Sequence, residues 1–381
     1  MKIHPNVVLI VADDMGYGDF GLFNDGPART PCIDQITTQG VCLTQHYAGS
    51  PVCSPSRATL LTGRYSHRTG ALTPMEVRGL DRIALDEVTI GDMFKYSGYA
   101  TGLVGKWHNG AFDRRYHPNA RGFDEFFGFC GGWMDYFDWW VERNGRRENA
   151  DGRYLTDVFT DEAIDFVTRH QHRPFFLSVM YNAPHTPLQA PDRDIKPYLD
   201  SGLSPGLAIT YAMNEVMDRG IAKIVETLDE LGLAEDTIIM FTSDNGPAFS
   251  LAGRPDQVPE GVSTDLRRYN CNFNGAKGSV YEGGIRVPMI MRWPGGLEQS
   301  QKLDEMVHGV DWLPTLAGLC GIEPIKGRKL DGRDVSMVLN GERISSPARF
   351  WQLNQFEPIG WINAAMREGP WKLVRPRVAQ R

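Results

Sequence analysis

The chain has 381 residues, of which 41% are apolar and 23% charged, and its net charge at neutral pH is -7. This length allows one large α/β domain or two smaller ones, and the composition is that of an ordinary globular protein. No long run of Lys or Arg occurs, which argues against nucleic acid and an anionic membrane surface as partners. A small anion held in one basic pocket remains compatible with this charge balance.

The first apolar run is short. Residues 7–12 (VVLIVA) lead directly into Asp13 and Asp14. Six apolar residues are too few for the core of a signal peptide or for a membrane span. We therefore expect a cytoplasmic protein, or a periplasmic or secreted one if a signal has been replaced by the start Met. The six cysteines form no Cys-x-x-Cys pair, so we expect them to be mostly reduced.

Apolar runs and amphipathic stretches alternate along the chain. Buried strands are expected at residues 7–12, 100–104, 174–181, 237–242 and 287–293, and helices at residues 156–170, 209–231 and 306–319. The alternation predicts an α/β fold in which helices flank a mostly parallel central sheet on both faces.

Two regions break this rhythm. Residues 243–284 are rich in Gly, Pro, Asn and Asp, and they predict a long functional or mobile loop. After about Lys326, Gly-rich turns separate short strand candidates at residues 361–366 and 371–374. We therefore expect a large domain over residues 1–325 and a small C-terminal antiparallel subdomain over residues 326–381.

Oxygen-bearing side chains follow two of the predicted strands. Asp13 and Asp14 come directly after residues 7–12, and Asp244 and Asn245 follow residues 237–242. Open α/β sheets place their ligands at the carboxyl ends of strands, and adjacent carboxylates repel unless a cation neutralises them. Each pair alone fits a turn or a helix cap equally well. Two such pairs together favour a site for a hard divalent cation.

Cys53 lies at the predicted start of a helix. Pro55 suits the first helical turn and Gly63 suits the helix end. Backbone donors and the helix dipole at such a start favour an anion, and Arg57, one turn later, suits sulfate or phosphate oxygens. On chemistry alone, a buried free thiol is the commoner state of a cysteine.

Residues 53–64 (CSPSRATLLTGR) carry the most specific pattern, because they resemble the signature of the type I sulfatases. In that family the Cys of Cys-x-Pro-x-Arg is oxidised to formylglycine by a dedicated enzyme. Further blocks resemble those of the family and follow in its order over most of residues 5–335: residues 13–19 (DDMGYGD), 105–108 (GKWH), 183–187 (APHTP), 244–246 (DNG), 275–279 (GAKGS) and 281–288 (YEGGIRVP). The resemblance implies an alkaline-phosphatase-like fold.

The resemblance also implies a cofactor and a nucleophile. One Ca²⁺, favoured over Mg²⁺, would be held by Asp13, Asp14, Asp244, Asn245 and an oxygen of the modified Cys53. Hydrated formylglycine has two hydroxyls. One would attack sulfur and displace the alcohol, and the other would then expel sulfate and restore the aldehyde.

The other matched residues take implied roles in the same reaction. Arg57 and Lys106 would stabilise the nucleophile and the sulfate oxygens, and His108 would act as the base of the second step. His185 and Lys277 would steady the sulfate and protonate the leaving oxygen. The remaining histidines are expected to be ordinary surface or core residues: His4, His46, His67, His117, His170, His172 and His308.

Three features concern specificity and completeness. The aromatic stretch of residues 123–140 (FDEFFGFCGGWMDYFDWW) is expected mainly in the core, although Trp133, Tyr136, Trp139 or Trp140 would suit stacking on a substrate ring. Residues 139–141 are the better specificity candidates, and Asn109 replaces a Leu common in the family. Because the strand at residues 371–374 normally leads into further sequence, we expect a short or truncated form.

The expected partners are a small-molecule or saccharide sulfate ester and, during maturation, the formylglycine-generating enzyme. Two alternatives stay open at this point. A phosphonate monoester or phosphodiester hydrolase on the same fold would use a similar site. A protein that binds a sulfated ligand with unmodified Cys53 would need no acid or base, whereas Lys106, His108, His185 and Lys277 supply both. The oligomeric state is not predicted by any pattern.

Overall fold

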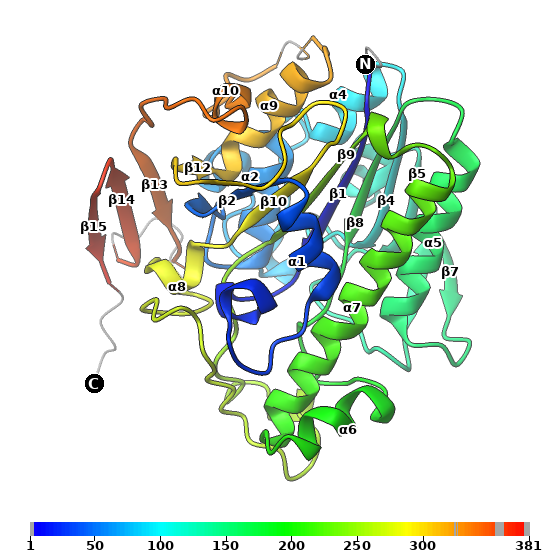
Figure 1. The fold of residues 1–381 in the computed structure, drawn as a ribbon, viewed down its shortest axis with the longest axis vertical. Helices are drawn as coiled ribbons and strands as arrows, with labels where there is room; N and C mark the ends of the chain where they lie inside the picture. Colours follow the sequence, from blue (N-terminus) through cyan, green and yellow to red (C-terminus); the bar gives the residue numbers. More distant parts are fainter. Residues whose placement is uncertain (1–3, 324, 326, 355–361, 377–381) are drawn as a thin grey trace.

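A ten-stranded mixed sheet runs through the centre of the molecule (Figure 1). The computed structural model describes residues 4–323, 325, 327–354 and 362–376. In spatial order the strands are β11 (Gln301–Leu303), β2 (Val41–Leu43), β10 (Met289–Arg292), β9 (Thr237–Ser243), β1 (Asn6–Ala12), β8 (Phe175–Met180), β4 (Ala100–Lys106), β5 (Glu125–Phe129), β6 (Trp140–Arg143) and β7 (Arg146–Asn149). The central five strands, β9-β1-β8-β4-β5, are mutually parallel, and β10, β6 and β7 pair antiparallel to their neighbours.

Helices cover both faces of the sheet (Figure 1). They are α1 (Pro31–Thr38), α2 (Cys53–Thr62), α3 (Ser66–Thr69), α4 (Ile90–Tyr96), α5 (Leu155–His170), α6 (Asp192–Asp200), α7 (Pro205–Glu230), α8 (Glu282–Ile285), α9 (Trp312–Leu319) and α10 (Ser336–Leu339). Alternate residues of β1 enter two separate cores, because successive side chains of a strand point to opposite faces. Val8 and Ile10 pack with α1, α5 and α7, whereas Val7 and Leu9 pack with α2, α4 and α9.

The predicted mostly parallel sheet with helices on both faces is confirmed. All five predicted strands and the helices at residues 156–170 and 209–231 are present, with shifts of a few residues at their ends. The helix expected at residues 306–319 is partly wrong. Val307–His308 form β12, which pairs with β3 (His46–Tyr47), and α9 begins only at Trp312. The Asp311 carboxylate accepts from the His308 backbone N–H (3.0 Å), which fixes a 3-10 turn ahead of the helix.

A small antiparallel sheet lies beside the large one. It consists of β13 (Arg349–Gln352), β14 (Ala364–Glu368) and β15 (Trp371–Arg375). The indole N–H of Trp351 donates to the Ala48 carbonyl (2.9 Å), and buried Arg349 pairs with buried Asp311. The predicted antiparallel C-terminal sheet is confirmed, although Trp361, the first residue of one strand candidate, lies outside the described residues. The domain boundary at residue 325 stays a prediction.

Two further observations concern the whole chain. All six cysteines are free thiols in the structure, as expected from their spacing. In the part of the chain that the structure describes, no helix is both long enough and apolar enough to cross a membrane.

Candidate functional site

The candidate site lies where the central parallel strands end. Asp13 and Asp14 follow β1, Asp244 and Asn245 follow β9, and Lys106 ends β4. Because β9, β1, β8 and β4 are parallel neighbours, their carboxyl ends meet at one edge of the sheet. The strand order therefore brings together residues that lie up to 232 positions apart in the sequence.

Two site residues adopt a backbone conformation that is uncommon outside glycine. Asp14 has a φ of 68° and His108 a φ of 53°. Such left-handed residues cost free energy and persist where the surrounding structure enforces them, often at functional sites. Here each one turns the chain sharply just beyond a buried strand, so that its side chain stays at the sheet edge.

Cys53 is the first residue of α2, as predicted, and the whole helix is buried. Val52 precedes it in extended conformation, and Gly63 ends the helix with a φ of 65°, as the sequence indicates. Two backbone contacts fix the surroundings of Cys53. Gly278 N–H donates to the Pro51 carbonyl (2.8 Å), and the Asn109 amide donates to the Ser54 carbonyl (3.0 Å).

Three buried acids each face a cation across the site. Lys106 Nζ donates to Asp13 Oδ2 (2.5 Å) and Lys277 Nζ donates to Asp14 Oδ2 (2.7 Å). The Arg57 Nε donates to Asp244 Oδ2 (2.9 Å), and its Nη1 donates to the Lys106 carbonyl (3.1 Å). The predicted carboxylates and cations thus form one connected network at the start of α2.

The pKa values of the three acids in this network are shifted in different directions. Burial opposes ionisation of Asp13 and Asp14, but the nearby cations, led by Lys106 and Lys277 respectively, hold the pKa of each carboxyl below its usual value. Burial and the charge of Asp13 raise the pKa of Asp244 well above its usual value, although Arg57 opposes this shift. The three acids therefore differ in how readily they ionise.

The donor set fits a hard divalent cation. Asp13 Oδ1 and Asn245 Oδ1 are buried oxygens without a hydrogen-bond partner among the described residues. Asn245 Nδ2 donates to Asp14 Oδ1 (2.8 Å), which leaves its carbonyl oxygen available for a ligand role. Orphaned oxygens beside crowded carboxylates are what an oxygen-coordinated cation such as Ca²⁺ requires.

His108 is oriented by its own contacts. Its Nε2 lies 3.3 Å from the Pro74 carbonyl and 3.5 Å from Glu76 Oε1, so this nitrogen carries the proton. Its Nδ1 is buried without a hydrogen-bond partner among the described residues and is the free lone pair. Burial, with Lys106 as the next cause, lowers the pKa of His108 to about 3, so the ring is neutral at physiological pH.

His185 shows the opposite tautomer. Its Nδ1 donates to the Thr186 carbonyl (2.7 Å), whereas its Nε2 faces Asp14 Oδ2 at 3.8 Å and accepts from Arg254 Nη1 at 3.4 Å. Burial and Lys277 lower the pKa of His185 to about 3. The Asp14 carboxylate and burial act oppositely on Lys277, and the net effect raises the pKa of that ammonium group. Lys277 is therefore the protonated member of this pair.

All the residues predicted from the sequence meet at this site, but two neighbours were missed. Glu76 contacts His108, and its Oε1 also accepts from the Gly132 backbone N–H (2.5 Å). Arg254 contacts His185 from the long loop. Neither follows a strand or belongs to a recognisable motif, so no sequence signal marked them.

The specificity candidates differ in their burial. Asn109 is fully buried and bonds to the backbone of Ser54 and Asp81, which makes it a tie between segments. Tyr136 and Trp139 are buried in the core, whereas Trp133 is 51% and Trp140 37% exposed.

Comparison with known proteins agrees with this geometry. The family model described as Sulfatase matches residues 5–322. The chain belongs to the sulfatase family. A second model, N-sulphoglucosamine sulphohydrolase, C-terminal, matches residues 275–373. Human N-acetylgalactosamine-6-sulfatase is 33% identical over 91% of this chain and 68% of its own length, and human steryl-sulfatase is 31% identical over 91% and 71%. This sulfatase is accordingly a sulfuric ester hydrolase.

Solved structures share the fold. Ps i-CgsB in complex with k-i-k-neocarrahexaose superposes with a TM-score of 0.86 at 31% identity, covering 98% of this sulfatase and 84% of that chain. The phosphonate monoester hydrolase of Agrobacterium radiobacter gives a TM-score of 0.70 at 20% identity, covering 97% and 86%. The second likeness is one of fold alone.

The contact between Glu76 and His108 generates a prediction about pH. The Glu76 charge favours the imidazolium form, so its removal in Glu76→Gln lowers the pKa of His108 further. The acid limb of kcat, where His108 becomes protonated, is expected to move to lower pH by on the order of one unit. The measurement is a pH–rate profile with an aryl sulfate.

Glu76→Gln keeps an oxygen acceptor for the Gly132 N–H, so the loop contact is retained. Glu148→Gln, on exposed β7, is the matched control and should leave the profile in place. An acid limb at the same pH in Glu76→Gln and wild type would show that Glu76 does not act on His108.

Proposed function

We propose that this sulfatase hydrolyses the sulfate monoester of a small aryl or sugar compound, using formylglycine made from Cys53 and one bound calcium ion. The observation that carries the proposal is the position of Cys53. It begins a buried helix at the sheet edge where three acids and three cations converge. Maturation by a formylglycine-generating enzyme is part of the proposal.

Asp13, Asp14, Asp244 and Asn245 would hold the cation together with an oxygen of the modified Cys53. Oxygen ligands of mixed carboxylate and amide type suit Ca²⁺, whereas Mg²⁺ demands stricter octahedral geometry and retains more water. When bound, the cation would draw charge from a sulfate oxygen as the reaction proceeds.

The two cations near Cys53 support attack on sulfur. Arg57 is held rigidly by Asp244 and the Lys106 carbonyl, so its planar guanidinium is already oriented. Lys106 is completely buried, and its ammonium group keeps full electrostatic strength in the absence of water. Together they stabilise negative charge on the nucleophile and on the equatorial sulfate oxygens.

His108 takes the proton in the second step. Its Nδ1 lone pair is unengaged, while the Nε2 proton is fixed by oxygens of Pro74 and Glu76. A hydrated aldehyde, supplied by the modified residue, retains a second hydroxyl after the alcohol has left. Removal of that hydroxyl proton by His108 releases sulfate without hydrolysis of a stable alkyl sulfate.

The leaving oxygen lies on the side of Lys277 and His185. Lys277 is protonated at neutral pH and steadies the sulfate group. An anionic ester beside His185 favours the imidazolium form, which opposes the effect of burial. With Nδ1–H committed to Thr186, a proton on Nε2 is aimed into the site and is available to the departing alcohol.

The relatives indicate a class of substrate. Two similar proteins are an N-acetylgalactosamine-6-sulfatase and a carbohydrate-bound chain solved with k-i-k-neocarrahexaose. We infer that a sulfated saccharide is the substrate of this sulfatase. The position of the sulfate does not follow from the site, because the contacts above all concern the tetrahedral group.

The proposed function predicts first that Cys53 is converted to formylglycine. Protein produced with the maturation enzyme is expected to lose the mass that separates a thiol side chain (CH₂SH) from an aldehyde (CHO). Peptide mass spectrometry around Cys53 measures this directly. Cys53→Ala is expected to keep the wild-type melting temperature and to lose turnover of an aryl sulfate. A variant that retains the wild-type rate would remove formylglycine from the mechanism.

The proposed function also predicts which ester group, sulfate or phosphonate, reacts faster. Matched aryl sulfate and aryl phosphonate monoesters share one leaving group, so their kcat/KM values differ only through the transferred group. We expect the sulfate to react faster, with Cys53→Ala as the blank for both esters. Faster phosphonate cleavage would identify this protein as a phosphonate hydrolase on the same fold.

The proposed function predicts, third, that a bound cation stabilises the protein. Gathered carboxylates repel in its absence, so chelation is expected to lower the melting temperature of the wild type. A ligand present at a hundred times its Kd stabilises a protein by about 2.7 kcal/mol. In Asp244→Ala, calorimetry should show weaker calcium binding and a smaller effect of chelation. Asp265→Ala removes an exposed acid of the same loop and is the control. Identical melting of wild type with and without chelator contradicts this site.

A further inference from the structure

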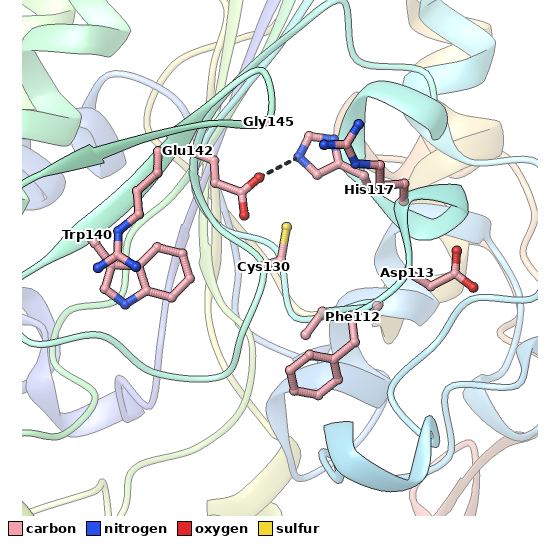
Figure 2. Close-up of a pocket in the computed structure, with 11 residues that line it drawn as sticks. Phe112, Asp113, His117, Cys130, Trp140, Glu142 and Gly145 are labelled. Atoms are coloured by element: carbon pink, nitrogen blue, oxygen red, sulfur yellow. Dashed lines mark ion pairs between the residues drawn. The ribbon is translucent and has the colours of Figure 1, made fainter.

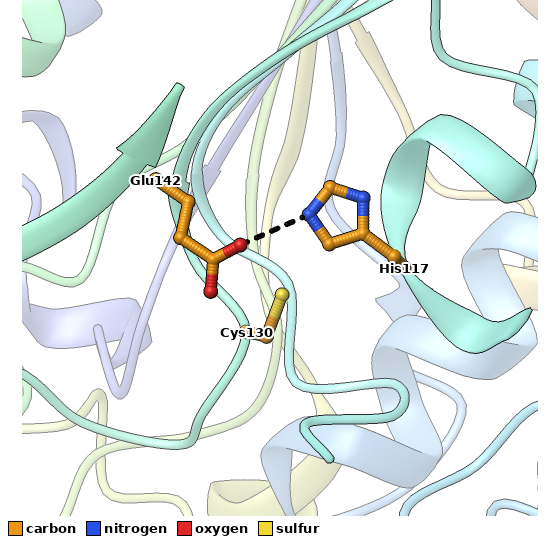
Figure 3. A group of neighbouring side chains, drawn as sticks. All are labelled: His117, Cys130 and Glu142. Atoms are coloured by element: carbon orange, nitrogen blue, oxygen red, sulfur yellow. Dashed lines mark ion pairs between the residues drawn. The ribbon is translucent and has the colours of Figure 1, made fainter. Parts of the chain in front are cut away.

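A second cluster of ligand-type side chains lies outside the site described above (Figure 3). His117 sits between two 3-10 turns, Cys130 directly follows β5, and Glu142 belongs to β6. A ring nitrogen, the thiol sulfur and a carboxylate oxygen of these residues all lie within 4.8 Å of one another. The antiparallel pairing of Gly128 with Glu142 and the edge-on packing of His117 against Phe126 bring the three segments together.

The donor atoms of this cluster are poorly satisfied. His117 Nε2 is buried without a hydrogen bond and lies 3.3 Å from Glu142 Oε2. The Cys130 side chain is buried, and burial together with nearby acids, Glu142 first, raises the pKa of its thiol above the ordinary value. A thiol, an imidazole nitrogen and a carboxylate, three types of metal ligand, therefore meet at one place.

The cluster borders a pocket of about 250 Å³ (Figure 2). Figure 2 shows the Cys130 sulfur between the side chains of Glu142 and His117, with Trp140 and Phe112 on the flanks. Three protein donors beside an open volume leave room for a water molecule or another small ligand as a fourth. This is the arrangement of an open tetrahedral metal site.

The chemical types of the three ligand atoms indicate which metal ion would bind. Imidazole nitrogen, thiolate sulfur and carboxylate oxygen are all ligands of Zn²⁺, whereas Ca²⁺ takes oxygen ligands. Two ligands about 2 Å from a tetrahedral Zn²⁺ stand roughly 3.3 Å apart. His117 Nε2 and Glu142 Oε2 already have this separation.

We propose that His117, Cys130 and Glu142 form a binding site for a zinc-class transition-metal ion, distinct from the oxygen-lined active site. The ion fastens the end of β5 to β6 and to the turn that carries His117. The Cys130 carbonyl accepts from the His108 backbone N–H (3.2 Å), so the metal-bound segment also holds the loop of the catalytic base.

Binding requires a balanced movement of protons. The Cys130 thiol releases one proton to solvent and becomes a thiolate. His117 Nδ1 now accepts from the Asn119 backbone N–H (3.3 Å), which places the ring proton on Nε2. Coordination through Nε2 moves that proton to Nδ1 and ends the Asn119 contact, a small loss against three coordination bonds. Zinc affinity therefore rises with pH as the thiol is deprotonated.

The test uses the whole protein and needs no enzymatic activity. Because the active site also contains acids and a histidine, Asp13→Ala serves as the background. After removal of metals by a chelator, calorimetry with Zn²⁺ is expected to give about one bound ion. Cys130→Ser or His117→Ala in the same background should weaken that binding at least tenfold.

Cobalt gives a signature of the sulfur ligand. Co²⁺ bound to a thiolate produces a sulfur-to-metal charge-transfer absorption, which is expected in Asp13→Ala and absent after Cys130→Ser. His170→Ala is the matched control, because His170 pairs with Glu125 (2.7 Å) at similar exposure but without a cysteine. Cys130→Ala replaces Cys130→Ser if the latter does not fold.

Each outcome of these measurements either supports or overturns the proposed zinc site. Loss of zinc and of the charge-transfer band in the cluster variants, with both retained in His170→Ala, supports the site. Absence of a bound ion in Asp13→Ala overturns it, as does zinc or a cobalt–thiolate band that survives Cys130→Ser. None of these measurements depends on sulfate ester hydrolysis, so failure here leaves the proposed function untouched.

Discussion

The charge balance of three buried carboxylates governs the whole active-site edge. Asp13, Asp14 and Asp244 are brought together because the strands before them are parallel neighbours, so the fold itself creates the repulsion. Lys106, Lys277 and Arg57 each pair with one acid, but burial and the charge of Asp13 still raise the pKa of Asp244. In the proposed function, a divalent cation would add positive charge at this edge and would attract the anionic sulfate ester.

The same constraint explains why the histidines are arranged as they are. Burial among cations keeps both rings neutral, so neither adds positive charge to an already crowded site. Their tautomers are set by backbone and carboxylate oxygens on the side away from the reaction, at Pro74 and Glu76 for His108 and at Thr186 for His185. Each ring therefore presents its unprotonated nitrogen inward. One fold thus holds two neutral imidazoles in opposite tautomers at the same site.

The sequence predicted much of this because its signals are local. Apolar runs marked the central strands, and the residues directly after them marked the acids; the pattern around Cys53 marked the helix start, including Gly63 at its end. The site residues that the sequence did not predict depend on contacts between distant segments. Glu76 meets His108 only through the folded loop beside Gly132, and Arg254 reaches His185 from a loop without periodicity. Likewise, the expected helix at residues 306–319 begins late because Val307 and His308 pair with β3 and the Asp311 carboxylate accepts from the His308 backbone N–H.

His117 illustrates the same point for a second kind of chemistry. In the sequence it belongs to no motif that suggests a ligand role, and only the pairing of β5 with β6 brings Cys130 and Glu142 to it. The two clusters differ in donor type, since one is lined by oxygens and the other combines nitrogen, sulfur and oxygen. Hard Ca²⁺ and borderline-soft Zn²⁺ are sorted by this difference rather than by affinity alone. The proposed calcium and zinc sites therefore share no residue.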